Sequence, residues 1–94
     1  MTFPLGRIVA TPGCLQVLEE AGQTPAEFLQ RHASGDWGDL CDEDKQANGI
    51  ALKSGGRIFS AYHTTTKTKL WVITEGTDDS GIRRSTCLLL PSEY

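Results

Sequence analysis

Residues 57–90 contain three short segments rich in β-branched, aromatic and other apolar residues: RIFSAY (Arg57–Tyr62), KLWVITE (Lys69–Glu75) and STCLLL (Ser85–Leu90). Each lacks internal proline and glycine and is too short for an independent helix, which is typical of β-strands. The connections, residues 63–68 and 76–81, are polar and contain turn-forming residue types. We therefore predict three strands joined as an antiparallel meander.

Alternate side chains of a strand point to opposite faces of the sheet, and here both sets are largely apolar. Within their strands, one set consists of Phe59 and Ala61, Trp71 and Ile73, and Cys87 and Leu89, and the other of Ile58 and Tyr62, Leu70 and Val72, and Leu88 and Leu90. A sheet with one solvent-facing side would alternate apolar and polar residues. We therefore expect helices on one face and a loop or a partner on the other.

The N-terminal segment carries signals for a strand and then a helix. Leu5–Ala10 has the composition of a fourth strand. Thr11 and Pro12 are the residue types preferred at the N-cap and first position of a helix, and Gly22 is suited to end it.

Two further helices are predicted before the meander. Thr24 and Glu27 have the spacing of a capping box, and Gly35 ends the helix that they begin. Acidic residues 42–44 suit the positive end of a third helix, which residues 54–56 terminate. Its expected buried positions are Leu40, Ala47, Ile50 and Ala51. These elements predict an α+β fold, an antiparallel three- to four-stranded sheet packed against two or three short N-terminal helices.

Length and charge restrict the class of protein. The chain has 94 residues and a formal net charge of −3, so we expect a single domain spanning residues 1–94 without a concentrated basic surface for duplex nucleic acid. The cysteines, Cys14, Cys41 and Cys87, are widely spaced, and no apolar run has the length of a membrane span. We expect a cytoplasmic protein with reduced thiols.

The segment from His32 to Asp44 combines a histidine, a tryptophan between glycines and five acidic residues. We expect it to bind a partner protein through an exposed aromatic side chain and negative charge. The predicted partner-binding residues are His32, Asp36, Trp37, Asp39, Asp42, Glu43 and Asp44. The alternative is structural: Trp37 packs under the sheet, an aspartate caps a helix, and the acidic run is a solvated helix start.

The histidines His32 and His63 also permit a catalytic hypothesis, in which Asp36 or Asp39 orients a histidine base. No nucleophile motif accompanies them, so a small enzyme using His32 with a nearby carboxylate is an alternative and not the main prediction. The cysteines and histidines lack the close spacing of structural zinc ligands. We expect no metal and no cofactor.

Four basic residues lie near the predicted strand ends: Lys67, Lys69, Arg83 and Arg84. If the last strand starts beside the end of the first hairpin, they would converge into an anion-binding patch. That arrangement would suit a small nucleic-acid-binding regulatory module, the second alternative function. The same residues could instead keep the sheet edges soluble, which is the favoured interpretation.

Several segments together resemble a known family. They are residues 32–40 (HASGDWGDL), 43–45 (EDK), 57–62 (RIFSAY), 70–75 (LWVITE) and 88–94 (LLLPSEY). The chain resembles small uncharacterised bacterial proteins of plasmids, phages and integrated elements, often labelled plasmid-related or associated with type I restriction. The resemblance implies an accessory protein of a mobile element.

A small acidic chain without a catalytic constellation is expected to act by binding another protein complex, encoded by the host or by the element. The leading hypothesis is inhibition of a host defence nuclease complex, of CRISPR or restriction type, whose nucleic-acid-binding surface would be covered by the acidic face. The second apolar sheet face also predicts self-association, as a homodimer.

Overall fold

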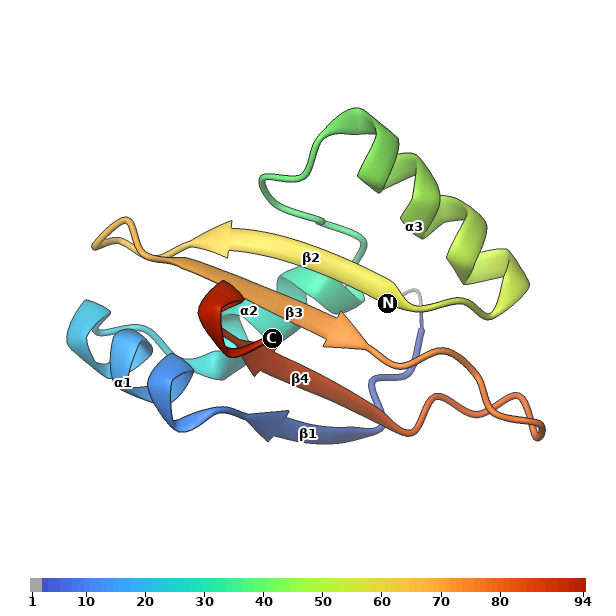
Figure 1. The fold of residues 1–94 in the computed structure, drawn as a ribbon, viewed down its shortest axis with the longest axis horizontal. Coiled ribbons are helices and arrows are strands. Elements are labelled where there is room, and N and C mark those ends of the chain that lie inside the picture. Colours follow the sequence, from blue (N-terminus) through green and yellow to red (C-terminus); the bar gives the residue numbers. More distant parts are fainter. Residues whose placement is uncertain (1–2) are drawn as a thin grey trace.

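The computed structural model describes residues 3–94, which form an α+β fold with three α-helices and a four-stranded sheet (Figure 1). Along the chain the elements are β1 (Arg7–Ala10), α1 (Pro12–Ala21), α2 (Pro25–Ala33), α3 (Asp42–Ser54), β2 (Ile58–His63), β3 (Lys69–Thr74), β4 (Ser85–Leu89) and the 3₁₀-helix η1 (Pro91–Glu93). All four predicted strands and all three predicted helices are present.

The sheet has the strand order β1-β4-β3-β2 and is mixed. Strands β2, β3 and β4 form the predicted antiparallel meander, but β1 pairs with β4 in parallel. The prediction of a wholly antiparallel sheet is therefore wrong at β1, and the helices lie between strands in the sequence. Short turns force antiparallel neighbours, whereas the long connection between β1 and β4 permits a parallel pair.

One face of the sheet, here called the helix face, is covered by α1 and α2. Its central side chains, Tyr62, Leu70, Val72 and Leu88, are fully buried against Cys14 and Leu18 of α1 and Phe28 of α2. They belong to one of the two sets that the strand alternation predicts. The helix face is thus the main core of the protein.

The opposite face, here called the open face, is covered only in part. It carries the second predicted set, in which Phe59, Trp71 and Cys87 remain partly exposed. The C-terminal segment folds back over it, with η1 in front of the strands in Figure 1 and the Tyr94 ring 5.7 Å from the Trp71 ring. The chain itself therefore supplies some of the second cover that the sequence required.

The predicted caps are present in α1, and the predicted capping box is absent in α2. Thr11 accepts a hydrogen bond from the Cys14 amide at 3.3 Å, and Gly22 has φ +67°, as predicted for the two ends of α1. The predicted capping box of α2 is wrong, because the Thr24 side chain makes no cap bond and Glu27 instead accepts from Gln23 Nε2 at 2.7 Å. A neighbouring amide therefore competes successfully for the carboxylate.

The predicted buried positions of helix α3 are confirmed at Ala51 and wrong at Ala47 and Ile50. Asn48 and Ala51 are buried, whereas Ala47 is exposed and Ile50 is 67% exposed. The Asn48 side chain donates to Phe59 O at 2.6 Å and accepts from Phe59 N at 3.0 Å. These two hydrogen bonds to the edge of β2 fix the rotation of the helix about its axis. The polar residue Asn48 therefore faces the sheet, whereas the hydrophobic pattern predicted that Ala47 and Ile50 would.

Candidate functional site

The segment Trp37–Asp39 has a structural role at the edge of β2. The Asp39 amide donates to Ala61 O at 2.7 Å, and the Ala61 amide donates to Trp37 O at 3.2 Å. Together with the Asn48 amide on Phe59, these bonds satisfy the outward-facing backbone groups at the centre of β2. The edge is therefore closed to further strand pairing.

Gly38 allows this close approach. Its φ is +73°, and a Cβ atom there would overlap the Ala61 carbonyl oxygen and the Tyr62 ring. We expect Gly38→Ala to lower the free energy of unfolding by about 3 kcal/mol, from left-handed strain and the clash together. Urea unfolding measures the change.

Gly22→Ala is the matched control, because Gly22 has φ +67° and open space around the added Cβ. It should lose only the strain contribution, about 1 kcal/mol. Equal losses in the two variants would show that the approach of Gly38 to β2 is not what requires glycine.

Trp37 packs inward instead of standing free on the surface. Its ring lies 5.9 Å from the His32 ring and 6.2 Å from the Phe3 ring, and the side chain is partly buried beside Ile58 and Ala51. This is the structural alternative of the sequence analysis. Trp37 is therefore not the exposed anchor that the partner-binding hypothesis required.

His32 is fully buried at the end of α2, so its side chain cannot contact a partner. Its Nδ1 lies 2.5 Å from Ser60 Oγ, and its Nε2 lies 2.9 Å from Thr74 Oγ1. Thr74 Oγ1 is 2.7 Å from Thr86 Oγ1, which donates to Leu5 O at 2.7 Å. The hydroxyl groups therefore connect α2 to three strands and to the chain before β1.

The carbonyl oxygen of Leu5 is the last acceptor in this series of hydrogen bonds, and it fixes the direction of each bond between it and His32 Nε2. Thr86 donates to a carbonyl, so it accepts from Thr74, which in turn accepts from Nε2–H of His32. Nδ1 is then the acceptor for Ser60. Burial lowers the pKa of His32 to about 4, so the ring is neutral at pH 7. Its hydrogen-bond partners within residues 3–94 are the hydroxyl groups of Ser60 and Thr74, so the predicted base of His32 with a carboxylate is not formed. The predicted pairing of a histidine with a carboxylate is present only between the exposed side chains of His63 and Asp39, among the residues that the structure describes.

The predicted acidic surface divides into two parts. Asp36 pairs with Arg31 at 2.7 Å, and the hydrogen bond from Arg31 lowers the pKa of the Asp36 carboxyl. Asp39 contacts His63 Nδ1 at 2.7 Å. In the described part of the chain, the carboxylates of the first turn of α3 make no ion pair; they are exposed and comprise Asp42, Glu43 and Asp44. Of the five predicted carboxylates, these three have no basic side chain in contact among residues 3–94.

The four basic residues do not converge. Arg83 is buried, with only 5% of its surface exposed, and Arg84 pairs with Asp78 at 2.7 Å. Lys69 lies opposite His63 at one end of β3, whereas β4 begins beside the other end, where Thr74 pairs with Thr86. The predicted anion-binding patch of Lys67, Lys69, Arg83 and Arg84 is therefore wrong.

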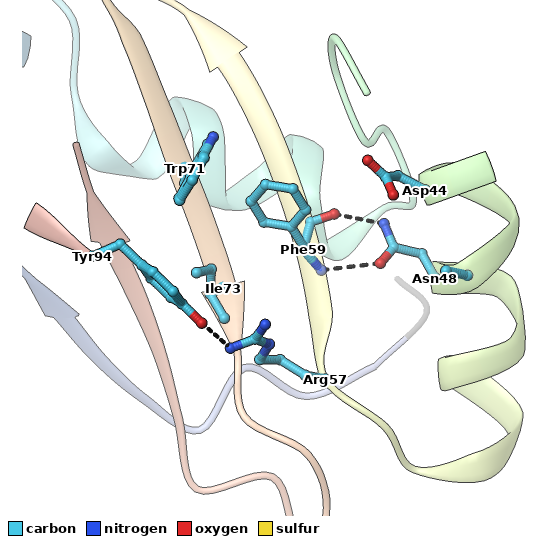
Figure 2. A pocket seen from close by; sticks show the side chains of 8 residues that line it. Asp44, Asn48, Arg57, Phe59, Trp71, Ile73 and Tyr94 are labelled. Atoms are coloured by element: carbon cyan, nitrogen blue, oxygen red, sulfur yellow. Dashed lines mark hydrogen bonds between the residues drawn. The ribbon is translucent and has the colours of Figure 1, made fainter. Parts of the chain in front are cut away.

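The open face contains a pocket that the sequence analysis did not identify. It has a volume of about 320 Å³ and lies over β2 and β3, between α3 and the C-terminal tyrosine (Figure 2). The rings of Phe59 and Trp71 meet edge to face at 5.1 Å, and those of Trp71 and Tyr94 at 5.7 Å. The pocket is lined by Asp44, Ala47, Asn48, Arg57, Phe59, Trp71, Ile73 and Tyr94, and is called here the aromatic pocket.

Polar groups surround this aromatic surface. Arg57 donates to the Tyr94 hydroxyl at 2.6 Å, and Figure 2 shows the pair on the side of the pocket opposite Asp44 and Asn48. Trp71 Nε1 is buried and is the only such side-chain nitrogen or oxygen in residues 3–94 without a hydrogen-bond partner. A buried donor left unpaired costs about 1–3 kcal/mol. The pocket therefore combines aromatic walls with polar side chains at its rim, and Trp71 Nε1 does not open into it.

Cysteines and other metal-binding residue types form no cluster here. Cys14 is buried, Cys41 is exposed and Cys87 is partly buried, all three as free thiols. Burial raises the pKa of Cys14 to about 11. Within residues 3–94 no group of three histidine, cysteine or acidic side chains could hold a metal ion.

Comparison of the chain with protein-family models, curated proteins and solved structures found no match in any of the three. In residues 3–94, no helix has the length and apolar character needed to span a bilayer. The function is therefore inferred from the geometry of the chain itself.

Proposed function

We propose that the protein binds another polypeptide through the aromatic pocket and the acidic first turn of α3. The observation that supports this is a pocket walled by Phe59, Trp71 and Tyr94 that adjoins three exposed, unpaired carboxylates. Interfaces draw most of their energy from a few apolar or aromatic side chains seated in such pockets, while charge around them favours the correct partner. Asp44 belongs to both features, since it lines the pocket and lies in the acidic turn.

The chemistry of the site indicates the kind of ligand. Its volume of about 320 Å³ is at the low end of the range of about 300–1,000 Å³ for small-molecule sites, and suits an apolar side chain entering from outside. The carboxylates of Asp42, Glu43 and Asp44 favour lysine or arginine beside that side chain. The expected ligand is an aromatic or large aliphatic residue flanked by basic residues.

Filling the pocket from α3 tests the proposal. Ala47 is exposed and lines the pocket, so Ala47→Trp would place an indole in the volume that the ligand side chain needs. Selection from a display library of random peptides should give sequences with an aromatic or aliphatic residue next to basic ones. Ala47→Trp should weaken their binding at least about tenfold, or about 1.4 kcal/mol, as measured by calorimetry.

Two matched variants complete this experiment. Ala26→Trp places the same side chain at an exposed position of α2 and should leave binding unchanged. Neutralising the acidic turn, with Asp42→Asn, Glu43→Gln and Asp44→Asn together, should weaken binding and reduce its salt dependence. The control for charge is Glu19→Gln, Glu20→Gln and Asp79→Asn. Peptides without the expected pattern, or equal effects of the two tryptophan variants, would exclude the aromatic pocket as the site.

The identity of the partner is proposed from the resemblance to mobile-element proteins. On that basis the partner is a host defence nuclease complex in the cytoplasm, and the acidic turn of α3 competes with nucleic acid for a basic surface. The measurement is DNA binding by purified CRISPR and type I restriction complexes. Inhibition should disappear in the triple-neutral variant of α3, and its absence with every complex tested would remove this part of the proposal.

A further inference from the structure

The two edges of the sheet differ in whether their outward-facing backbone groups are hydrogen-bonded. The edge of β2 is closed by the Trp37–Asp39 segment and by Asn48. Strand β1 forms the other edge, and its four residues are mainly exposed. An unprotected edge strand is a template for pairing with another strand.

The hydrogen bonds of β1 show which of its backbone groups are free. The amide of Arg7 donates to Arg84 O at 2.9 Å, and that of Thr11 donates to Leu88 O at 3.0 Å, so the odd-numbered residues face β4. The N–H and C=O groups of Ile8 and Ala10 therefore point away from the sheet. Within residues 3–94, no backbone bond from outside the sheet reaches them.

The side chains at this edge are also uncovered. Among residues 3–94, two of the six exposed large hydrophobic side chains belong to β1: Ile8 at 44% and Val9 at 39%. The edge lacks the proline, lysine or bulge that usually prevents pairing, and Arg7 is its only charge. Both the backbone and the side chains are therefore available to a second strand.

We propose that this edge pairs with β1 of a second copy of the chain, antiparallel about a two-fold axis at Val9, to form a continuous eight-stranded sheet. Ile8 of each copy then lies opposite Ala10 of the other, and each such pair exchanges two backbone hydrogen bonds. A two-fold axis makes the same surface complementary to itself. This interface involves the sheet edge and not the open face, and it is independent of the proposed function.

Charge complementarity selects a second copy as the occupant. In this register Arg7 lies opposite Thr11 of the second copy, with both side chains on the open face. Thr11 Oγ1 contacts Glu93 Oε1 at 2.5 Å, so a carboxylate stands beside the position that Arg7 faces. Within residues 3–94, neither an ion pair nor a side-chain hydrogen bond occupies Arg7. Each dimer thus gains two Arg7–Glu93 pairs.

Packing on the open face is continuous across the same axis. Val9 is in register with Cys87, Cys87 with Ile73 and Ile73 with Phe59, which forms one apolar row across the sheet. Pairing at Val9 joins the rows of the two copies and covers the exposed Val9 side chains. The short strands make a small interface, so we expect a weak dimer with Kd of about 10–100 μM.

Disulfide trapping tests both pairing and register. In a background with Cys41→Ser and Cys87→Ala, Val9→Cys should form an intermolecular disulfide under mild oxidation, since facing residues of a non-hydrogen-bonded pair have Cα atoms about 4.5 Å apart. Ile8→Cys is the matched control, because its two copies lie diagonally, beyond disulfide reach. Equal cross-linking at both positions, or none at Val9→Cys, would overturn the register.

Sedimentation of the unmodified chain tests the dimer without a variant that could misfold. The wild-type protein should show concentration-dependent dimerisation, and Arg7→Glu should raise the Kd about fivefold or more by placing like charges together. Lys53→Glu, an equal change of charge at an exposed position of α3, should leave the Kd unchanged. A monomer at all concentrations up to about 0.5 mM, well above the expected Kd, would refute the proposal.

Discussion

Replacing Arg83 with methionine is expected to lower the free energy of unfolding by about 3–5 kcal/mol, although sequence analysis placed this arginine on the surface. Its guanidinium donates to Gly56 O at 2.6 Å, Glu75 O at 3.0 Å and Ala51 O at 3.1 Å. The side chain is 5% exposed, and its cationic carbon lies 5.8 Å from the centre of the Phe3 ring. Arg83 thus joins the end of α3 to the β3–β4 connection.

The size of the effect follows from Gly56 O and Glu75 O, which lose their guanidinium donor, whereas Ala51 O still accepts from the amides of Gly55 and Gly56. A hydrogen bond to a charged group contributes about 1.5–3 kcal/mol, and a buried acceptor left without a donor costs about 1–3 kcal/mol. Methionine fills much of the volume but donates nothing. Removing a buried charge returns some desolvation energy, consistent with the pKa of Arg83 being lowered by burial, so the net loss is smaller than the sum.

Arg84→Met is the matched control, because the Arg84 side chain is exposed and its one ion-pair partner among residues 3–94 is Asp78. Exposed ion pairs contribute about 0–1 kcal/mol, so this variant should unfold at nearly the wild-type urea concentration. The m-values should be unchanged in both variants. Equal losses for Arg83→Met and Arg84→Met would mean that the buried hydrogen bonds do not stabilise the junction.

The elements that sequence could predict are those specified by local chemistry. The three meander strands, the N-cap of α1 at Thr11 and its end at Gly22 depend on residues close to one another in the chain. The alternation within each strand could also be predicted, since it depends only on backbone geometry, whereas the register decides which residues of the three strands share a face. In each case neighbouring residues determine the outcome.

The features that sequence could not predict depend on distant partners. The rotation of α3 follows from the bonds of Asn48 to Phe59, and the burial of Arg83 follows from carbonyls on three other segments. The parallel pairing of β1 has no local signal. Each of these three features depends on contacts that form only in the folded chain. At Asn48 and Arg83, buried hydrogen bonds decide which side chain is buried, and not hydrophobicity.

The candidate site could be predicted only where it depends on neighbouring residues in the sequence. The exposed acidic turn of α3 was predictable from Asp42, Glu43 and Asp44 alone. The aromatic pocket requires Tyr94 to fold over Trp71, and α3 to stand beside β2. In the sequence, the pocket is indicated only by the second apolar set of strand residues. That set predicts a sheet face covered by a loop or a partner, and it does not by itself predict a binding pocket.

Acid is expected to destabilise the protein by about 3 kcal/mol between neutral pH and pH 4 through His32 alone. The ordinary histidine pKa of 6.5 applies in the unfolded chain, whereas burial lowers the pKa of His32 in the folded protein to about 4. The unfolded state therefore binds more protons in this interval, so stability is full above pH 6.5 and falls as the pH drops toward 4. Each pH unit of difference corresponds to about 1.4 kcal/mol.

The interval from pH 6.5 to pH 5 isolates this histidine from the carboxyl groups. The pKa values of Asp36, Asp78 and Glu93 are lowered by hydrogen bonds from ordinary values of 3.8 or 4.5, so the stability that they contribute is lost mainly below pH 5. Between pH 6.5 and pH 5, urea unfolding should show a loss of about 1.5 kcal/mol. The loss should be much smaller in His32→Gln, which keeps a donor and an acceptor but cannot titrate.

His63→Gln is the matched control, because it removes the exposed histidine and keeps the buried one. The loss of stability assigned to His32 should persist in this variant, and a wild-type slope in His32→Gln would contradict the assignment. The tautomer gives a second measurement. Since Leu5 O can only accept, the series of hydroxyl hydrogen bonds requires a proton on Nε2, and the neutral ring then has none on Nδ1, a state that imidazole ¹⁵N shifts distinguish directly. Protonating Nδ1 would reverse this hydrogen bond, because Nδ1–H would donate and the Ser60 hydroxyl would accept, so the cost of acid lies in placing a charge at a buried site.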